Sequence, residues 1–148
     1  LADDASTRPE VPELLRSYAA RDKRIRLVLR ERNGHISRAS NSALALADAP
    51  WAAFLDHDDL LTANALWEMA DCLEKEKKRG KQKLVLFSDE DKCDGAASRF
   101  YEPNFKPDYN PDLLRSNNYI CHFLVAERDL VAHDRNGIFE RIKAAQRI

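Results

Sequence analysis

Three segments of this sequence end in clusters of carboxylates, and these clusters restrict how the chain can fold. The clusters are Asp3 with Asp4, Asp56 with Asp58 and Asp59 after the apolar run WAAFL, and Asp89 with Glu90 and Asp91 after KLVLF. Stretches with helical spacing of apolar residues separate them. Alternating strands and helices predict an α/β sheet with helices on its faces, in which ligands bind beyond the carboxyl ends of the strands. We therefore expect the acidic clusters to converge on one rim.

The periodicity of the apolar residues gives the expected elements. Helices are predicted at 9–22, 36–49 and 63–80, a helical turn at 112–118, and strands at 24–31, 51–55, 83–87 and 119–126. On the helix at 63–80, the apolar face is expected to contain Leu66, Met69, Ala70 and Leu73. Residues 94–111 are rich in proline and aromatic residues and are expected to be irregular.

Composition excludes several classes of protein. The 148 residues suit one domain, and 24 basic residues against 25 acidic ones leave no basic surface for a nucleic acid. No apolar run approaches the ~20 residues of a membrane span. Three widely spaced cysteines argue against a disulfide framework, with Cys72 and Cys121 expected as buried thiols. We expect a cytoplasmic protein, with peripheral association with the inner membrane left open.

Carboxylates on a shared rim need a compensating cation or hydrogen-bond donors. Their hard oxygen ligands select Mg²⁺, Mn²⁺ or Ca²⁺. One short turn supplies few protein ligands, which favours an ion that completes its shell with water and substrate phosphates. The alternative is that Asp59 caps the following helix, because Asp is common at helix N-termini. The residues by themselves thus indicate a metal-dependent site for a phosphorylated or nucleotide substrate.

Four motifs in order resemble the nucleotide-sugar-binding core of family 2 glycosyltransferases, which have the GT-A fold. They are Asp3-Asp4-Ala5-Ser6, the turn Asn33-Gly34, the helix segment Ala39-Ser40-Asn41, and Phe54-Leu55 followed by Asp56-His57-Asp58-Asp59. The later segments LFSDEDKCD and FYEPNFKPDYNPDLLRSNNYICHFLV resemble the bacterial branch that builds O-antigen and other surface polysaccharides. The resemblance implies a Rossmann-like, mostly parallel sheet with helices on both faces.

The resemblance also implies roles for individual residues. Asp4 would bind the base of a UDP- or dTDP-sugar, Asn33, Gly34 and Asn41 would shape the nucleotide pocket, and Asp56 or Asp58 would contact the ribose. Asp58 and Asp59 would hold Mn²⁺ or Mg²⁺ against the diphosphate. Asp89, Lys106, Asn118 and Tyr119 would lie on the acceptor side, facing a glycan or lipid-linked acceptor. A homo-oligomer is left open.

Two departures from the family pattern concern the ends of the chain. The family's first strand, with an apolar-T/S-Y-N signature, has no counterpart before Leu1, so we expect a fragment of the domain. The family's catalytic base follows a G-G-F stretch, whereas Gly137 and Glu140 are the only similar residues here. We therefore expect the base beyond the chain, with Glu90 and Asp91 as weaker candidates. Within 1–148, residues 1–90 would bind the donor and 91–148 the acceptor.

Two alternatives remain. The run AAFLDHDDLLT also resembles haloacid-dehalogenase-type phosphatases, in which Asp56 would be the nucleophile and Asp58 the general acid, although Asp59 and Leu60 replace that family's glycine and threonine. The other alternative is a non-catalytic remnant that binds nucleotide and transfers nothing. An EF-hand calcium loop is excluded because its glycine and terminal acid are absent.

Overall fold

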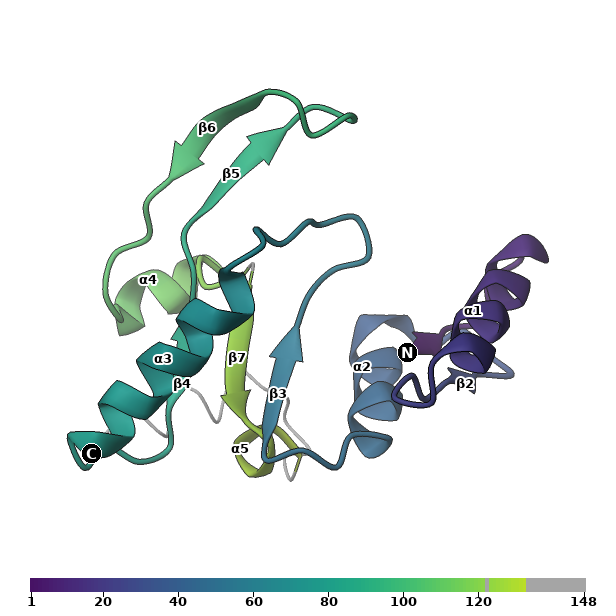
Figure 1. Ribbon diagram of the computed structural model, residues 1–148, viewed down its shortest axis with the longest axis horizontal. Helices are drawn as coiled ribbons and strands as arrows, with labels where there is room; N and C mark the ends of the chain where they lie inside the picture. Colours follow the sequence, from purple (N-terminus) through teal and green to yellow (C-terminus); the bar gives the residue numbers. More distant parts are fainter. Residues whose placement is uncertain (122, 133–148) are drawn as a thin grey trace. The chain divides into compact units, whose positions relative to one another are not determined.

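The computed structural model describes residues 1–121 and 123–132. It divides into two compact units, Leu1–Pro50 and a second unit that begins at Trp51 (Figure 1). Each unit has its own strands and helices, and each is described here by itself. The predicted functional division near residue 90 is a separate matter and stays a prediction.

The first unit is built on a strand–helix–strand motif. Strands β1 (Ala2–Asp3) and β2 (Val28–Leu29) pair in parallel, with helix α1 (Glu10–Arg21) as the connection. A parallel pair requires such a crossover, because a tight hairpin turn can join only antiparallel strands. Helix α2 (His35–Ala45) follows β2 and contacts β1, with Leu44 as its buried residue. The predicted helices and parallel pairing are confirmed, with β2 shorter than the predicted strand.

A three-stranded sheet forms the centre of the second unit. Strand β7 (Leu124–Glu127) lies between β3 (Trp51–Phe54) and β4 (Val85–Phe87) and is antiparallel to both. Strands β3 and β4 therefore run in the same direction. Phe54 and Phe87, the last residues of these two strands, both pair with Leu124. The acids that follow β3 and the acids that follow β4 consequently leave the sheet at the same edge, here called the acidic edge.

Helices cover both faces of this sheet. Leu73 of α3 (Ala65–Lys78) packs with Phe123 and Val125 on one face. Leu114 of α4 (Pro111–Ser116) packs with Leu124 and with the chain before β7 on the other face. Consecutive residues of β7 enter different clusters because successive side chains of a strand point to opposite faces. The α/β fold with helices on both faces is confirmed.

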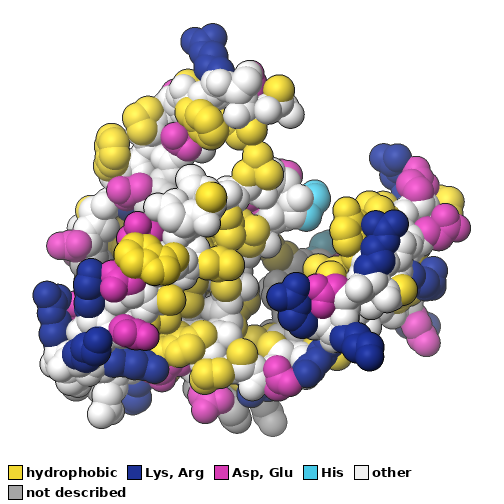
Figure 2. Space-filling model, in the orientation of Figure 1, with side chains coloured by type: hydrophobic (Ala, Val, Ile, Leu, Met, Phe, Trp, Pro, Cys, Tyr) yellow, Lys and Arg dark blue, Asp and Glu magenta, His cyan; other side chains and the backbone are white. Residues whose placement is uncertain are grey.

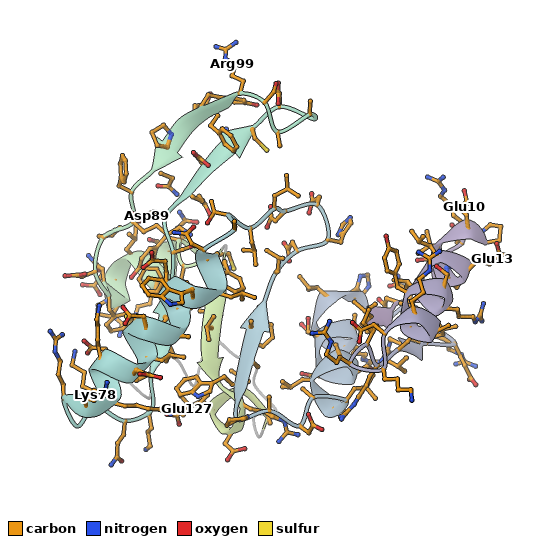
Figure 3. All side chains as sticks on the ribbon, viewed as in Figure 1. Glu10, Glu13, Lys78, Asp89, Arg99 and Glu127 are labelled. Atoms are coloured by element: carbon orange, nitrogen blue, oxygen red, sulfur yellow. The ribbon has the colours of Figure 1, made fainter. Side chains whose placement is uncertain are left out.

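Residues 90–104 form a hairpin rather than the irregular segment expected from residue 94 onward. Strands β5 (Glu90–Cys93) and β6 (Phe100–Asn104) pair antiparallel and extend from the acidic edge, with Asp89 at the root and Arg99 at the tip (Figure 3). Asp94 organises the turn, since its carboxylate accepts from the Ser98 amide, the Ser98 hydroxyl and the Arg99 amide. These hydrogen bonds also lower the pKa of Asp94. The prolines and aromatics therefore misled the sequence prediction.

Three finer predictions are corrected. Cys72 is exposed rather than buried, and Cys121 is only half-buried. Helix α3 starts at Ala65 after Asn64, so Asp59 does not cap it. Leu66 is 64% exposed, because the buried face of α3 centres on Leu73.

Basic side chains gather at the end of this helix (Figure 2), where they suit the negative end of the helix dipole. A short α5 (Arg128–Ala132) follows β7.

The two leucines of α3 give a matched test of this packing. We expect Leu73→Ala to lower the free energy of unfolding of the second unit by about 2 to 5 kcal/mol, because it empties a buried position. Urea unfolding followed by tryptophan fluorescence measures this, since Trp51 and Trp67 are the only tryptophans and both lie in the second unit.

Leu66→Ala is the control, as the same substitution on the same helix. Its side chain is already exposed, so the expected change is within about 0.5 kcal/mol. Equal losses in the two variants would contradict the assigned face of α3.

Candidate active site at the acidic edge

The acids after β3 form an exposed turn. The Asp59 amide donates to the Asp56 carbonyl oxygen over 3.3 Å, which brings the chain back on itself. The Asp58 side chain is 76% exposed, and its Oδ1 lies 3.9 Å from His57 Nδ1. Asp59 is partly buried. This turn presents carboxylates to solvent at the end of a strand, where a charged ligand has access.

The acids after β4 are held by one lysine. Lys106 Nζ lies 3.0 Å from Glu90 Oε2, and the Lys106 amide donates to Asp89 Oδ1 over 2.8 Å. The other oxygen of Glu90 accepts from Asn104 Nδ2 over 2.9 Å. Both Glu90 oxygens are thus engaged, so Glu90 would have to release a partner before it could take a proton from an acceptor hydroxyl. Asp91 lies exposed on β5.

Cys121 is in contact with the lysine that holds the acids after β4. Asn118 Nδ2 donates to its sulfur over 3.0 Å, and Lys106 Nζ donates to its carbonyl oxygen over 3.0 Å. Burial raises the pKa of the Cys121 thiol, and the negative charges of Asp56 and Glu90 raise it further. The Asn118 hydrogen bond and the Lys106 charge lower this pKa, but they do not outweigh burial. Asn118 and Lys106 thus both hydrogen-bond to Cys121, and Lys106 links it to Glu90. Because β3 and β4 end opposite the same residue, the acids that follow the two strands share the acidic edge.

Tyr119 supports this edge from inside. Its side chain is 7% exposed and its ring meets the Phe87 ring edge-on, with centroids 5.7 Å apart. Its hydroxyl accepts from the Asn110 amide over 2.8 Å. Tyr119 is therefore a core residue next to the end of β4, and a direct contact with an acceptor stays a prediction.

The first unit gathers a second set of predicted residues around Asp4. Both Asp4 carboxylate oxygens lie 3.0 Å from the Gly34 amide, and Asn33 Nδ2 donates to the Asp4 carbonyl oxygen over 3.1 Å. The end of β1 is thereby fixed to the start of α2. Asn41 lies on the exposed surface of α2.

The sequence prediction missed Arg30. Its Nε donates to Asp4 Oδ1 over 2.7 Å and its Nη1 donates to Ser42 Oγ over 2.6 Å. Burial acts to raise the pKa of Asp4, but the Gly34 amide and the Arg30 guanidinium outweigh it and lower the pKa overall. The sequence did contain a signal for this contact, because Arg30 directly follows β2 and the paired acids Asp3 and Asp4 lie at the end of the neighbouring strand β1.

Gly34 is required by space. A Cβ at this position would lie 2.7 Å from both Arg30 Nη2 and Arg38 Cδ, and 2.8 Å from Arg38 Cβ. Contacts this short force a neighbour to move, and the Arg38 Cβ is fixed to the backbone of α2. The glycine therefore allows the Asp4, Arg30 and Gly34 groups to approach one another.

The carboxylate oxygens at the acidic edge suit a metal ion whose coordination shell is completed by water and phosphate oxygens. In the parts of the chain that the structure describes, no group of three or more His, Cys, Asp or Glu side chains is placed to hold a metal. The turn offers the oxygens of Asp58 and Asp59, which are hard ligands. The residues present thus fit Mg²⁺ or Mn²⁺ bound together with a diphosphate, and do not form a closed all-protein site.

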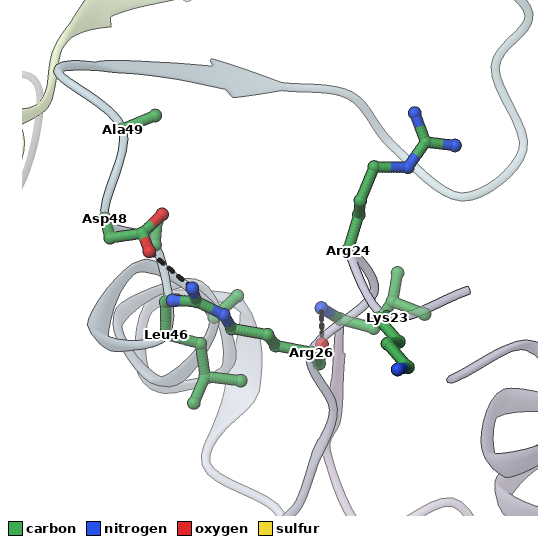
Figure 4. A pocket seen from close by; sticks show the side chains of 9 residues that line it. Lys23, Arg24, Arg26, Leu46, Asp48 and Ala49 are labelled. Carbon is green, nitrogen blue, oxygen red and sulfur yellow. Dashed lines mark hydrogen bonds and ion pairs between the residues drawn. The ribbon is translucent and has the colours of Figure 1, made fainter. Parts of the chain in front are cut away.

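A pocket of about 490 Å³ in the first unit lies apart from these residues (Figure 4). Its lining includes Arg24 and Arg26, but both guanidinium groups are already paired, with Asp22 and Asp48. The Arg24 hydrogen bonds lower the pKa of Asp22 to about 2. None of the predicted site residues lines this pocket.

The α/β fold and the acidic edge agree with the GT-A fold that the sequence predicts. Residues 1–133 match the family model for glycosyl transferase family 2, and the chain belongs to this family. This membership decides against the phosphatase alternative, because the match spans all four motifs, including the run that resembled the phosphatases. No helix in residues 1–121 or 123–132 is long and apolar enough to cross a membrane.

Two curated proteins are similar to the chain. The "Uncharacterized protein y4gI" of Sinorhizobium fredii is 46% identical over 131 residues, which are 88% of this chain and 14% of that protein. The "O-antigen biosynthesis protein RfbC" of Myxococcus xanthus is 38% identical over 146 residues, which are 99% of this chain and 11% of that protein. The chain thus spans a small part of the length of each relative.

The Asp4 contacts give a prediction about acid. The lowered pKa means that these contacts stabilise the fold above the ordinary value of 3.8 and lose their effect as the pH falls through the lower folded-state value. We expect Gly34→Ala to displace Arg30 and move the Asp4 pKa back up toward 3.8. Carboxyl carbon chemical shifts, followed by NMR from pH 7 to about pH 2, measure it.

Gly95→Ala serves as the matched control. A Cβ at Gly95 meets nothing within 4 Å, so the Asp4 titration should not change. An unchanged Asp4 titration in Gly34→Ala would mean that the glycine does not support the Asp4 contacts.

Proposed function

We propose that the chain is the donor-binding part of a glycosyltransferase that acts in polysaccharide biosynthesis. It takes a nucleoside-diphosphate sugar, of the UDP or dTDP type, and serves transfer to a glycan or lipid-linked acceptor. Family membership and the similarity to a protein named for O-antigen biosynthesis support the class of reaction. The observation that supports the proposal is the acidic edge, where the acids after β3 and the acids after β4 leave the sheet on the same side because both strands end opposite Leu124.

The proposed roles follow from charge and exposure. Asp58 and Asp59 on the exposed turn hold Mg²⁺ or Mn²⁺, and Asp56 or Asp58 contacts the ribose. The ion, when bound, neutralises the diphosphate and stabilises charge on the departing phosphate oxygen. In the first unit, the contacts among Asp4, Asn33 and Gly34 shape the nucleotide pocket. Asn41, on the helix α2 that begins directly after Gly34, contributes to the same pocket.

Transfer with inversion needs a general base for the acceptor hydroxyl. Because both Glu90 oxygens are engaged, Asp91 is the stronger of the two candidates on β5. We propose that the base otherwise comes from outside residues 1–132. If no base reaches the site, the chain binds the donor without transferring sugar. This is the alternative of a non-catalytic, nucleotide-binding protein.

Calorimetry tests the metal assignment. We expect UDP- or dTDP-sugars to bind in the presence of Mn²⁺, and Asp58→Asn and Asp59→Asn to weaken that binding about tenfold or more, because each removes a charged oxygen ligand. Titration with Mn²⁺ alone should show weaker binding, since the diphosphate supplies part of the shell.

The control is Glu13→Gln, which removes one exposed carboxylate from α1 and leaves the acidic edge intact. Tryptophan fluorescence checks that each Asp variant remains folded. Donor binding of parental strength in both Asp variants would refute the metal assignment, and the absence of donor binding by the parent chain would refute the proposed function itself.

A further inference from the structure

Lys106 is a buried cation in contact with several predicted site residues. Its side chain is 1% exposed. Burying a lysine ammonium is costly unless charged or polar partners compensate it. Here the partners are the Glu90 carboxylate and the Cys121 carbonyl, each 3.0 Å away. A cation kept at such a cost, and facing away from solvent, acts on its neighbours rather than on a ligand directly.

Lys106 and these two neighbours belong to three separate parts of the second unit. Glu90 begins the hairpin, Cys121 belongs to the chain that leads into β7, and Lys106 itself follows β6. The Lys106 amide adds a third contact, to Asp89, which follows β4. One residue thus ties both strands of the hairpin to the sheet at the acidic edge.

The other side-chain contact described at the hairpin root is the Asn104–Glu90 hydrogen bond, which joins the two strands of the hairpin to each other and not to the sheet. All five residues of β6 are exposed, so apolar burial contributes little to the placement of this strand. Exposed ion pairs such as Lys92 with Glu102, farther along the hairpin, contribute little because water screens them. The buried Lys106 contacts are screened much less and therefore dominate the position of the root.

We propose that Lys106 is a positioning residue of the transfer site, which acts through Glu90 to hold the hairpin root, and with it Asp89 and Asp91, on the acceptor side of the acidic edge. This inference rests on the proposed function. Lys106 does not contact the donor, so its loss affects the acceptor and the transfer step while donor binding persists.

A double-mutant cycle with Lys106→Met and Glu90→Gln tests the coupling. Each single variant should increase amide hydrogen exchange about tenfold across 89–106, measured by mass spectrometry, and the double variant should be no worse than the more affected single one. Lys92→Met, which breaks an exposed lysine–glutamate pair on the same hairpin, is the matched control and should leave the root unchanged. Additive effects of the two single variants would overturn the proposal.

Kinetics separate positioning from a merely structural role. Lys106→Met should lower kcat for transfer, or raise the acceptor KM, about tenfold while the donor Kd stays within about twofold, and Lys106→Arg should recover part of the loss. Parallel losses of donor binding and of stability measured by fluorescence would overturn the positioning role. Unchanged kinetics of Lys106→Met in an active protein would also overturn it.

If the parent chain transfers no sugar but binds donor, the hydrogen-exchange cycle still decides whether Lys106 holds Glu90. If the parent does not bind donor, the proposed function fails and the positioning role fails with it.

Discussion

The pairing of β7 with both β3 and β4 is the constraint on which the second unit depends. Because β7 is antiparallel to each neighbour, the two outer strands point the same way and end opposite Leu124. Their side chains alternate between two apolar clusters, one under α3 and one under α4. The pairing with β7 thus fixes the direction of both strands, and the acids that follow them share one edge as a consequence. The packing fixes which side chains face each helix.

Charge at that edge is compensated in two different ways. After β4, a buried lysine and an asparagine occupy the oxygens of Glu90, so this acid is part of the structure. After β3, the turn that bears Asp58 is exposed and open to a ligand. In the first unit, Arg30 and Gly34 likewise engage Asp4. Acids of one sequence pattern therefore divide into those whose oxygens are engaged within the protein and those that are exposed to solvent.

The strong patterns were predictable. The helices of the first unit, the parallel strand pair and the apolar runs before the acids follow from periodicity, and the order of the motifs indicated the family that the comparison confirms. The β5–β6 hairpin was not predictable, because its turn depends on Asp94 and its root on Lys106, neither of which leaves a periodic signal. Arg30 was missed for a related reason, since its partner Asp4 is 26 residues away.

The sequence by itself determined the α/β class, the order of the elements as far as β4, and the residues that can bear charge at strand ends. Local rules suffice for these, because periodicity and turn chemistry act over a few residues. Only the tertiary structure decided that Lys106 is buried against Glu90, that Tyr119 belongs to the core and that Cys72 is exposed. Such outcomes depend on which distant segments pack together, and the burial of a side chain is a property of that packing rather than of the residue.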